Sequence, residues 1–375
     1  MFRELLTKTV VGLDIGSTAV RGVELKTNGK SKPNLLRYYS IPLPPGAVSR
    51  GEVMQPEVVN LALKKLWSEG KFKSRNVVLG TGNQRTLVRD LSIPKASLKQ
   101  IRESLPLHVQ SMLQMPTEGS ILDFYPISES EGEHGLSVNG LLISTEKSSV
   151  VTNILAAQRA GLTAVEVELI PFALNRILMS KSQVMGTVAL IDVGGSTTTI
   201  IIARDGLPWF VRIIPFGGED LTQALQSKLQ IPFAEAEALK GDLRFRSSWE
   251  ITSDITGKTS QCACSKCASE ETLADDPRTL EILQSVSNEL LGSLRNTINY
   301  FNNTHPDEAV EQVLLTGGGA QLNGLSEALS EMIVLPVTLP DPFALIALGR
   351  KVKSVSREES ATFSVALGLA FRHSR

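Results

Sequence analysis

The stretch VGLDIGSTAVRGVEL, from Val11 to Leu25, decides the fold, because its pattern returns in the second half of the chain. The second copy, ALIDVGGSTTTIIIA, runs from Ala189 to Ala203 and has one extra glycine in its turn. Each copy is an apolar strand that ends in Asp, a Gly turn with Ser-Thr, and a second β-branched strand, which is a hairpin pattern. A repeat that opens both halves of a chain predicts a duplicated α/β fold with a cleft between related halves.

Length and composition describe an ordinary globular protein. The chain has 375 residues, of which 42% are hydrophobic and 21% charged, and its formal net charge is -1. The length predicts about two domains, and the small net charge argues against nucleic-acid binding. No apolar run reaches about 18 residues, and residues 1–8 show no secretory signal. We therefore expect a cytoplasmic protein that reaches a membrane only through a partner.

The two turns have the chemistry of phosphate-binding loops. Their residues are Asp14, Gly16, Ser17 and Thr18 in the first copy, and Asp192, Gly194, Gly195, Ser196 and Thr197 in the second. A tight turn without bulky Cβ groups directs backbone N–H donors at one point, and such a nest binds phosphate oxygens. Two carboxylates beside phosphates favour a hard cation such as Mg²⁺ held through water, and Arg21 would offset phosphate charge. One such turn alone is typical of any strand end, whereas two copies favour a nucleotide site.

A third glycine-rich element follows a strand pattern near the end of the chain. LTGGGAQLNGL runs from Leu315 to Leu325 and contains Gly317, Gly318 and Gly319. Glycines after a strand let the backbone approach a flat ring or sugar closely. The helix that follows adds N–H donors. An ordinary strand-to-helix turn is the alternative.

The combination resembles the actin-like ATPase superfamily, in the order phosphate, phosphate, adenosine. From Val11 to about Arg372, the chain also resembles the PilM family of type IV pilus assembly proteins. The stretches that carry this resemblance are PLPPGAV from Pro42, ILDFYPI from Ile121, AGLTAVEVELIPFAL from Ala160, GGEDLT from Gly217 and DPFALIALG from Asp341. The fold implied is two duplicated RNase H-like halves around a nucleotide cleft, with a small inserted α/β subdomain.

The resemblance also implies domain boundaries. The expected division is a first half at 1–84 to which 342–375 returns, an inserted subdomain at 85–165, and a second half at 166–341 with a base-binding part at about 217–310. Within the insertion, strands are expected at 85–93, 120–127 and 136–144, and helices at 97–114 and 148–160. Further helices are expected at 218–229, 232–240, 278–302, 322–332 and 360–371.

Site roles follow from the same resemblance. The two hairpin turns would hold the phosphates of ATP, and Asp14 and Asp192 would hold Mg²⁺ through water. Ribose and adenine contacts fall on Gly217, Gly218, Thr222, Glu237 and Lys240, with Gly317, Gly318 and Gly319 as the adenosine loop. Glu168 falls at the first connector between the halves, where the superfamily places a residue that orients attacking water. Relatives often carry Asp there, so at most slow ATPase activity is expected. Residues 366–370 resemble the second connector.

The implied partner is the N-terminal cytoplasmic tail of PilN, which would hold the protein at the inner membrane. Self-association is a further expectation that rests only on analogy with other proteins of this fold. One alternative is an FtsA-like division protein, but FtsA has a C-terminal membrane helix, whereas here the chain stops at Arg375 after the expected core helix. Another is a sugar or acetate kinase, which shares the DIG[ST] loop but needs a base that no Asp here supplies in a matching context.

One segment does not belong to the resemblance. QCACSKCAS, from Gln261, contains the three cysteines of the chain, Cys262, Cys264 and Cys267. Zn²⁺ is one interpretation of this spacing, but a fourth ligand is missing nearby, and the nearest histidine in sequence is His305. Reduced cysteines on an exposed loop are the preferred interpretation.

Overall fold

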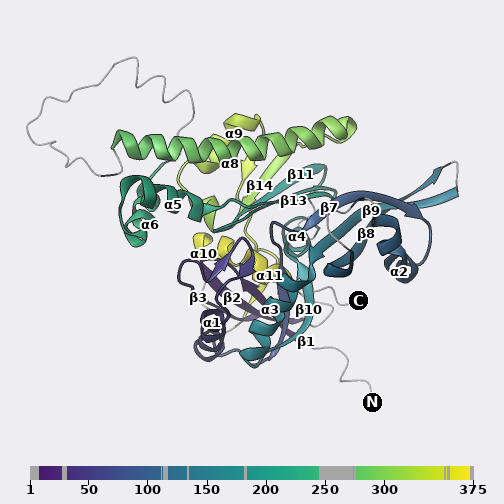
Figure 1. Ribbon diagram of the computed structural model, residues 1–375, viewed down its shortest axis with the longest axis horizontal. Helices are drawn as coiled ribbons and strands as arrows, with labels where there is room; N and C mark the ends of the chain where they lie inside the picture. Colours follow the sequence, from purple (N-terminus) through teal and green to yellow (C-terminus); the bar gives the residue numbers. More distant parts are fainter. Residues whose placement is uncertain are drawn as a thin grey trace, which may run out of the picture.

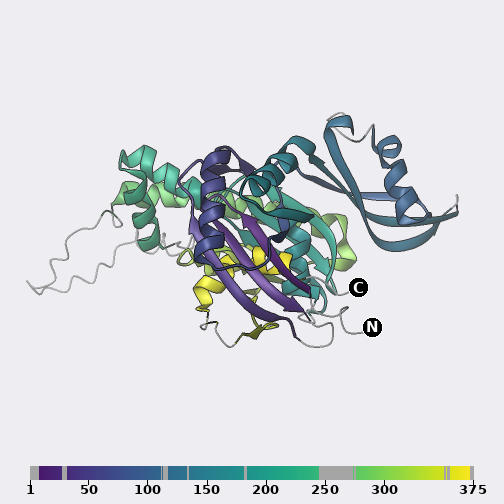
Figure 2. The same cartoon turned by 90° about the horizontal axis from the view of Figure 1, so that it is seen from below.

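In this computed structural model, the chain forms two related halves, with a small subdomain standing out from the first half to one side (Figures 1 and 2). The structure describes residues 8–27, 32–110, 112, 117–132, 135–180, 184–244, 273, 276–349, 352 and 355–371. The cysteine segment Cys262–Cys267 lies outside these residues, so its two interpretations stay predictions. Within the described ranges, every helix is too short or too polar to span a bilayer.

A six-stranded sheet with the order β10-β6-β1-β2-β3-β16 forms the first half. Its strands are β1 (Lys8–Ile15), β2 (Ala19–Thr27), β3 (Asn34–Pro42), β6 (Asn76–Thr81), β10 (Thr163–Leu169) and β16 (Ala347–Leu348). The helices α1 (Pro56–Glu69) and α3 (Lys147–Arg159) contact each other and pack their apolar faces against this sheet. A short hairpin, β4 (Val48–Ser49) and β5 (Glu52–Val53), precedes α1.

The second half repeats this topology. Its sheet has the order β13-β12-β11-β14-β15. As in β3-β2-β1-β6-β10, three antiparallel strands are followed by two parallel ones. The strands are β11 (Thr187–Val193), β12 (Thr198–Arg204), β13 (Leu207–Ile214), β14 (Gln312–Thr316) and β15 (Val337–Thr338). The duplication predicted from the two hairpin sequences is therefore confirmed by strand order as well as by sequence.

One face of the second sheet is covered by helices that share its core. These are α5 (Gly218–Leu229), α6 (Phe233–Asp242), α8 (Pro277–Thr304) and α9 (Leu325–Ile333). The long helix α8 crosses the top of the molecule in Figure 1. It buries an apolar stripe that includes Leu283, Leu290, Leu294 and Phe301, which is the 3.6-residue period of its sequence.

Two short helices form the core between the halves. α4 (Ile170–Asn175) follows β10 directly, and α11 (Ser364–Ala370) follows α10 (Arg357–Thr362) near the end of the described chain. Side chains of both helices pack in one cluster with residues of both sheets. A Cβ at Gly12 would lie 2.0 Å from the Ala366 carbonyl oxygen, so β1 packs against α11 with no side chain between them. These helices occupy the positions expected for the two connectors.

The inserted subdomain is a three-stranded sheet with a helix on it. Its strands, in the order β7-β9-β8, are β7 (Leu87–Pro94), β8 (Ser120–Gly132) and β9 (Gly135–Glu146), and its helix is α2 (Leu98–Val109). It ends earlier than the expected boundary at residue 165, because α3 packs on α1 and β10 pairs with β6. A segment that completes another sheet belongs to that sheet, wherever it falls in the sequence.

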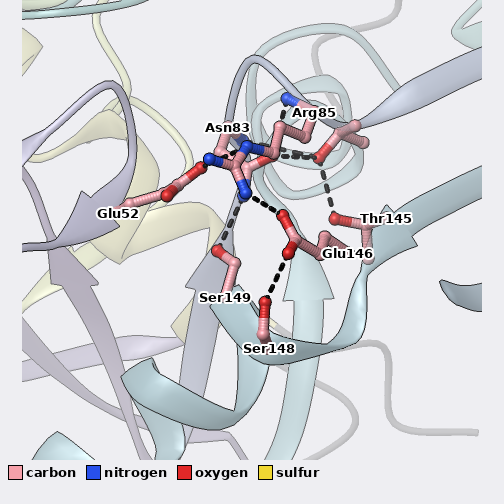
Figure 3. A network of polar contacts seen from close by, with 8 residues as sticks. Glu52, Asn83, Arg85, Thr145, Glu146, Ser148 and Ser149 are labelled. Atoms are coloured by element: carbon pink, nitrogen blue, oxygen red, sulfur yellow. Dashed lines mark hydrogen bonds and ion pairs between the residues drawn. The ribbon is translucent and has the colours of Figure 1, made fainter. Parts of the chain in front are cut away.

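Polar side chains fasten this subdomain to the first half (Figure 3). The buried Asn83 side chain, just after β6, donates to the Ser149 hydroxyl on α3 at 2.7 Å. Arg85 pairs with Glu146 at the end of β9, and its Nε lies 3.4 Å from the Glu52 carboxylate on β5. The β4–β5 hairpin, the loop after β6 and the inserted subdomain therefore meet in one network of polar contacts.

Candidate functional site

The two hairpin turns face each other across a cavity of about 100 Å³ between the halves. Its lining includes the predicted residues Asp14, Gly16, Ser17, Thr18, Arg21, Asp192, Gly194, Gly195, Ser196, Thr197, Gly317 and Gly318. The turns are nearly in contact, since a Cβ on Gly195 would lie 2.3 Å from Ser17 Oγ. The structure thus brings both predicted phosphate loops and part of the third glycine loop to one place.

Asp14 and Asp192 are the carboxylates at the ends of β1 and β11, and both are buried. Burial raises the pKa of Asp14 to about 6, although Arg21, 3.8 Å away, lowers it in part. Burial, together with the neighbouring charge of Asp14, raises the pKa of Asp192 to about 7, although Arg21 lowers it in part. Two buried carboxylates that repel each other form a site for a divalent cation, which would remove both the repulsion and part of the desolvation cost.

The second loop is held by the start of α5 through backbone contacts. Gly218 N donates to the Gly194 carbonyl at 3.0 Å, and Glu219 N donates to the Gly195 carbonyl at 2.7 Å. A Cβ on Gly217 would lie 2.4 Å from the Gly195 carbonyl oxygen. Only a glycine fits at this approach, so the GGED sequence positions the loop directly.

Three predicted sugar and base contacts form a polar cluster beside this helix start. Thr222 Oγ1 donates to Glu237 at 2.6 Å, and Lys240 Nζ lies 2.7 Å from the Glu237 carboxylate and 3.0 Å from Thr222 Oγ1. Burial raises the pKa of the adjacent Glu219, and Ser17 and Lys240 partly offset this. The cluster therefore offers a cation, a carboxylate and a hydroxyl at the contact between α5 and α6.

The third glycine loop lies against the second aspartate. Gly317 has a φ of 92°, which favours glycine, and a Cβ there would lie 2.6 Å from Asp192 Oδ1. Gly319 packs against Val193 and lies outside the cavity lining. An apolar pocket of about 10 Å³ adjoins the site and is lined by Val193, Phe216, Gly217, Gly218, Leu221, Val286, Leu290 and Leu322. That space holds about one water, so a base would enter only if the pocket widened.

Glu168 is not brought into the cavity. It lies at the junction of β10 and α4, as expected for the first connector, but its carboxylate pairs with Arg176. Arg176 also donates to the Gly368 carbonyl on α11 at 2.9 Å, so this pair joins the two connectors. The predicted role of Glu168 in orienting water stays a prediction that this geometry does not support.

Sequence reasoning missed Arg50, which spans the cleft from the tip of the β4–β5 hairpin. Its guanidinium forms two hydrogen bonds with Asp220, at 2.6 and 2.9 Å, and one with the Ser196 carbonyl at 2.8 Å. Its backbone N–H donates to Ser196 Oγ at 3.0 Å. The local signal was the Arg50-Gly51 pair, because a two-residue hairpin loop with positive φ at both central residues is a recognised turn. Nothing in the sequence indicated that Arg50 would contact Ser196 and Asp220.

These residues fit a magnesium-bound phosphate chain. Glycine turns leave room at their backbone N–H groups, Ser and Thr supply hydroxyls, and the two buried carboxylates suit a hard cation held through water. Asp14 and Asp192 would hold the cation, and the turns at 16–18 and 194–197 would hold phosphate oxygens. Asp14 and Asp192 are also the carboxylates that line the cavity in the described part of the chain.

Duplicated halves, facing hairpin turns and connector helices define the class of protein: an actin-like ATPase fold. A family model described as "Type IV pilus assembly protein PilM" matches residues 12–252, which is more than half of the chain. The chain therefore belongs to the PilM family. A second family model, "Cell division protein FtsA", matches residues 189–368.

The chain is also similar to solved structures and to curated proteins. A structure titled "PilM-PilN type IV pilus biogenesis complex" superposes with a TM-score of 0.80 and 25% identity over 98% of both chains. EutJ from Carboxydothermus hydrogenoformans has a TM-score of 0.53 and 14% identity, covering 99% of this chain and 93% of that one, and shows the fold alone. Cell division protein FtsA of Bacillus subtilis is 24% identical over 62% of this chain, and the alignment spans 57% of its length. FtsA of Enterococcus hirae is 25% identical over 68% of this chain and likewise aligned over 57% of its length.

Proposed function

We propose that this chain is the ATP-binding adaptor of a type IV pilus inner-membrane assembly complex. It binds Mg-ATP between its halves, binds the N-terminal cytoplasmic tail of a PilN-type protein, and is held at the inner membrane by that partner. The proposal that the chain binds Mg-ATP rests on one observation: the two glycine turns face each other with Asp14 and Asp192 between them.

The partner part is supported by family membership and by the extent of the structural match. The match to the PilM chain of a PilM-PilN complex covers 98% of both chains, so the inserted subdomain is included in it. Binding of an extended peptide in a groove is a recurring mode of peptide recognition, and here the peptide would belong to the protein that supplies the membrane anchor.

Turnover of ATP is proposed to be slow. Asp14 and Asp192 suit cation binding rather than proton abstraction, and Glu168 is held by Arg176. General-base catalysis needs a group within hydrogen-bond reach of the attacking water. Binding and conformational signalling are therefore favoured over rapid hydrolysis.

Calorimetric titration of the full chain with a synthetic peptide tests this proposal. The peptide is the N-terminal cytoplasmic segment of the PilN-type protein from the same genome, added with and without Mg-ATP. We expect micromolar binding in at least one condition, and a scrambled peptide of the same composition to give none. Intact ATP binding with no peptide binding in either condition would contradict the adaptor function.

The second candidate is an FtsA-like function, favoured by the FtsA model that matches residues 189–368. An FtsA-like protein binds lipid through its own chain. Co-sedimentation with anionic vesicles in the absence of any partner would favour this candidate, and vesicle binding only in the presence of the PilN-type protein would favour the adaptor.

A further inference from the structure

At the cleft, the β4–β5 hairpin of the first half contacts the second half. At its tip, the Arg50 guanidinium forms a bidentate ion pair with Asp220. The backbone N–H of Arg50 donates to the Ser196 hydroxyl, and its guanidinium donates to the Ser196 carbonyl. Asp220 also accepts a hydrogen bond from Gly217 N at 2.7 Å. One arginine thus contacts the second phosphate loop and the start of α5, which carries the proposed ribose contacts.

The cleft that Arg50 spans is narrow. Its cavity measures about 100 Å³, whereas sites for ligands of moderate size usually enclose roughly 300 Å³ or more. Ser17 lies so close to Gly195 that not even a methyl group fits between them. A nucleotide therefore enters or leaves only when the halves separate, and separation must break the contacts of Arg50.

We propose that the β4–β5 hairpin is a latch whose opening gates nucleotide exchange, with Arg50 as its positioning residue. The latch is closed in the free protein, is broken in the open state through which the nucleotide passes, and closes again on the bound nucleotide once the two loops have moved apart enough to hold it. This inference rests on the proposed nucleotide site and adds to it a residue that controls access.

The β4–β5 hairpin also contacts the residues that attach the inserted subdomain to the first half. A Cβ on Gly51, next to Arg50, would lie 2.2 Å from the Gly82 carbonyl oxygen, so the tip rests on the loop that follows β6. Glu52 lies beside Arg85, which pairs with Glu146 at the end of β9 (Figure 3). Movement of the tip therefore displaces the attachment of the subdomain, and nucleotide exchange is coupled to its position.

Stopped-flow kinetics with a fluorescent ATP analogue and Mg²⁺ tests the latch in the full chain. For Arg50→Ala we expect both the association and the dissociation rate constants to rise about two- to fivefold, the range for losing one partly exposed ion pair. The dissociation constant should change less than either rate constant. Arg50→Lys, which keeps the charge and the backbone N–H, should be intermediate.

Two further variants separate a latch from a general structural defect. Asp220→Asn keeps an oxygen to accept from Gly217 N but loses the charge pair, and should accelerate both steps. The double variant Arg50→Ala/Asp220→Asn should be no faster than the faster single variant, because both remove one interaction. Arg204→Ala removes an arginine that pairs with Glu308 inside the second half and should keep wild-type rates. Slower association in Arg50→Ala, or unchanged dissociation, would overturn the latch.

Hydrogen–deuterium exchange tests the link to the inserted subdomain. In the wild type, saturating Mg-ATP should increase protection of peptides from Leu87–Glu146. In Arg85→Ala this change should be lost while nucleotide exchange rates stay at wild type. Unaltered protection in the wild type would overturn the link. If the wild type bound no adenine nucleotide, the proposed function and the gating would both fail. If nucleotide bound but Arg50→Ala kept wild-type protection at residues 194–220 in the free protein, the latch alone would be overturned.

Discussion

At the scale of single residues, the chemistry of the site depends on two carboxylates that are costly to bury. The chain places Asp14 and Asp192 at the ends of two buried strands, with Arg21 as a partial counter-charge. Such a pair retains a proton in the free protein at a pH where an exposed aspartate has lost it. Binding of a divalent cation must displace that proton, so cation affinity and pH are linked.

This pair predicts how the stability of the metal-free protein depends on pH. The folded-state pKa values, about 6 and about 7, exceed the ordinary value of 3.8. Their contribution to the free energy of unfolding is therefore fully present below pH 3.8 and is lost as pH rises through about 6 and 7. Urea unfolding in EDTA should show this decline, and Asp192→Asn should flatten it. Asp123→Asn, on the exposed inserted subdomain, is the control, and an unchanged slope in Asp192→Asn would contradict the assignment.

At the scale of elements, the site is built by backbone docking between neighbouring elements. The N-terminus of α5 donates two backbone N–H groups to the second phosphate loop, and the hairpin tip at Arg50 contacts the same loop from the opposite half. Glycines stand where the backbones approach each other, so element positions depend on the absence of side chains.

Gly217→Ala tests this docking. The new Cβ would meet two backbone carbonyl oxygens, at 2.4 Å from Gly195 and 2.6 Å from Gly194, which no rotamer change relieves. We expect a loss of about 1–3 kcal/mol in the free energy of unfolding and weaker Mg-ATP binding. Gly292→Ala, inside α8 with open space around it, should instead stabilise by roughly 0.5–1 kcal/mol. Equal effects of the two substitutions in urea unfolding would contradict the docking.

At the scale of the whole molecule, two halves share one core around α4 and α11, and the cavity adjoins this core at Ile170 and Val365. The connectors are joined by Arg176, which binds both Glu168 and the Gly368 carbonyl. A ligand that contacts both halves favours the closed arrangement by the difference in its affinity for the two states.

Ligand linkage gives a prediction for the intact chain. Mg-ATP at 100 times its dissociation constant should raise the free energy of unfolding by about 2.7 kcal/mol, measured by urea unfolding. Because a nucleotide at the proposed site would contact both halves, they should unfold in one transition in its presence. Mg²⁺ with AMP, which lacks the outer phosphates, is the control. A midpoint that Mg-ATP leaves unchanged would contradict the placement of the site between the halves.

Local features of the fold could be predicted because they depend on neighbouring residues. The two hairpins and the helix α5 were expected from turn glycines and apolar periodicity, and the structure has them at 8–27, 187–204 and Gly218–Leu229. The inserted subdomain was expected too, but its end was placed beyond α3, at residue 165 inside β10. The strand pattern of Thr163–Leu169 predicts a strand and does not say which sheet that strand joins.

The sequence by itself determined the duplicated hairpins, the glycine turns and the two strand-end aspartates, because backbone conformation and strand periodicity are set within a few residues. Only the tertiary structure decided that Arg50 holds Ser196 and Asp220, partners 146 and 170 residues away. It likewise decided that Arg176 engages Glu168 and the Gly368 carbonyl, 192 residues away from the arginine. Such pairings depend on how whole elements pack, since two side chains meet only after the two sheets and the helices between them have taken their places.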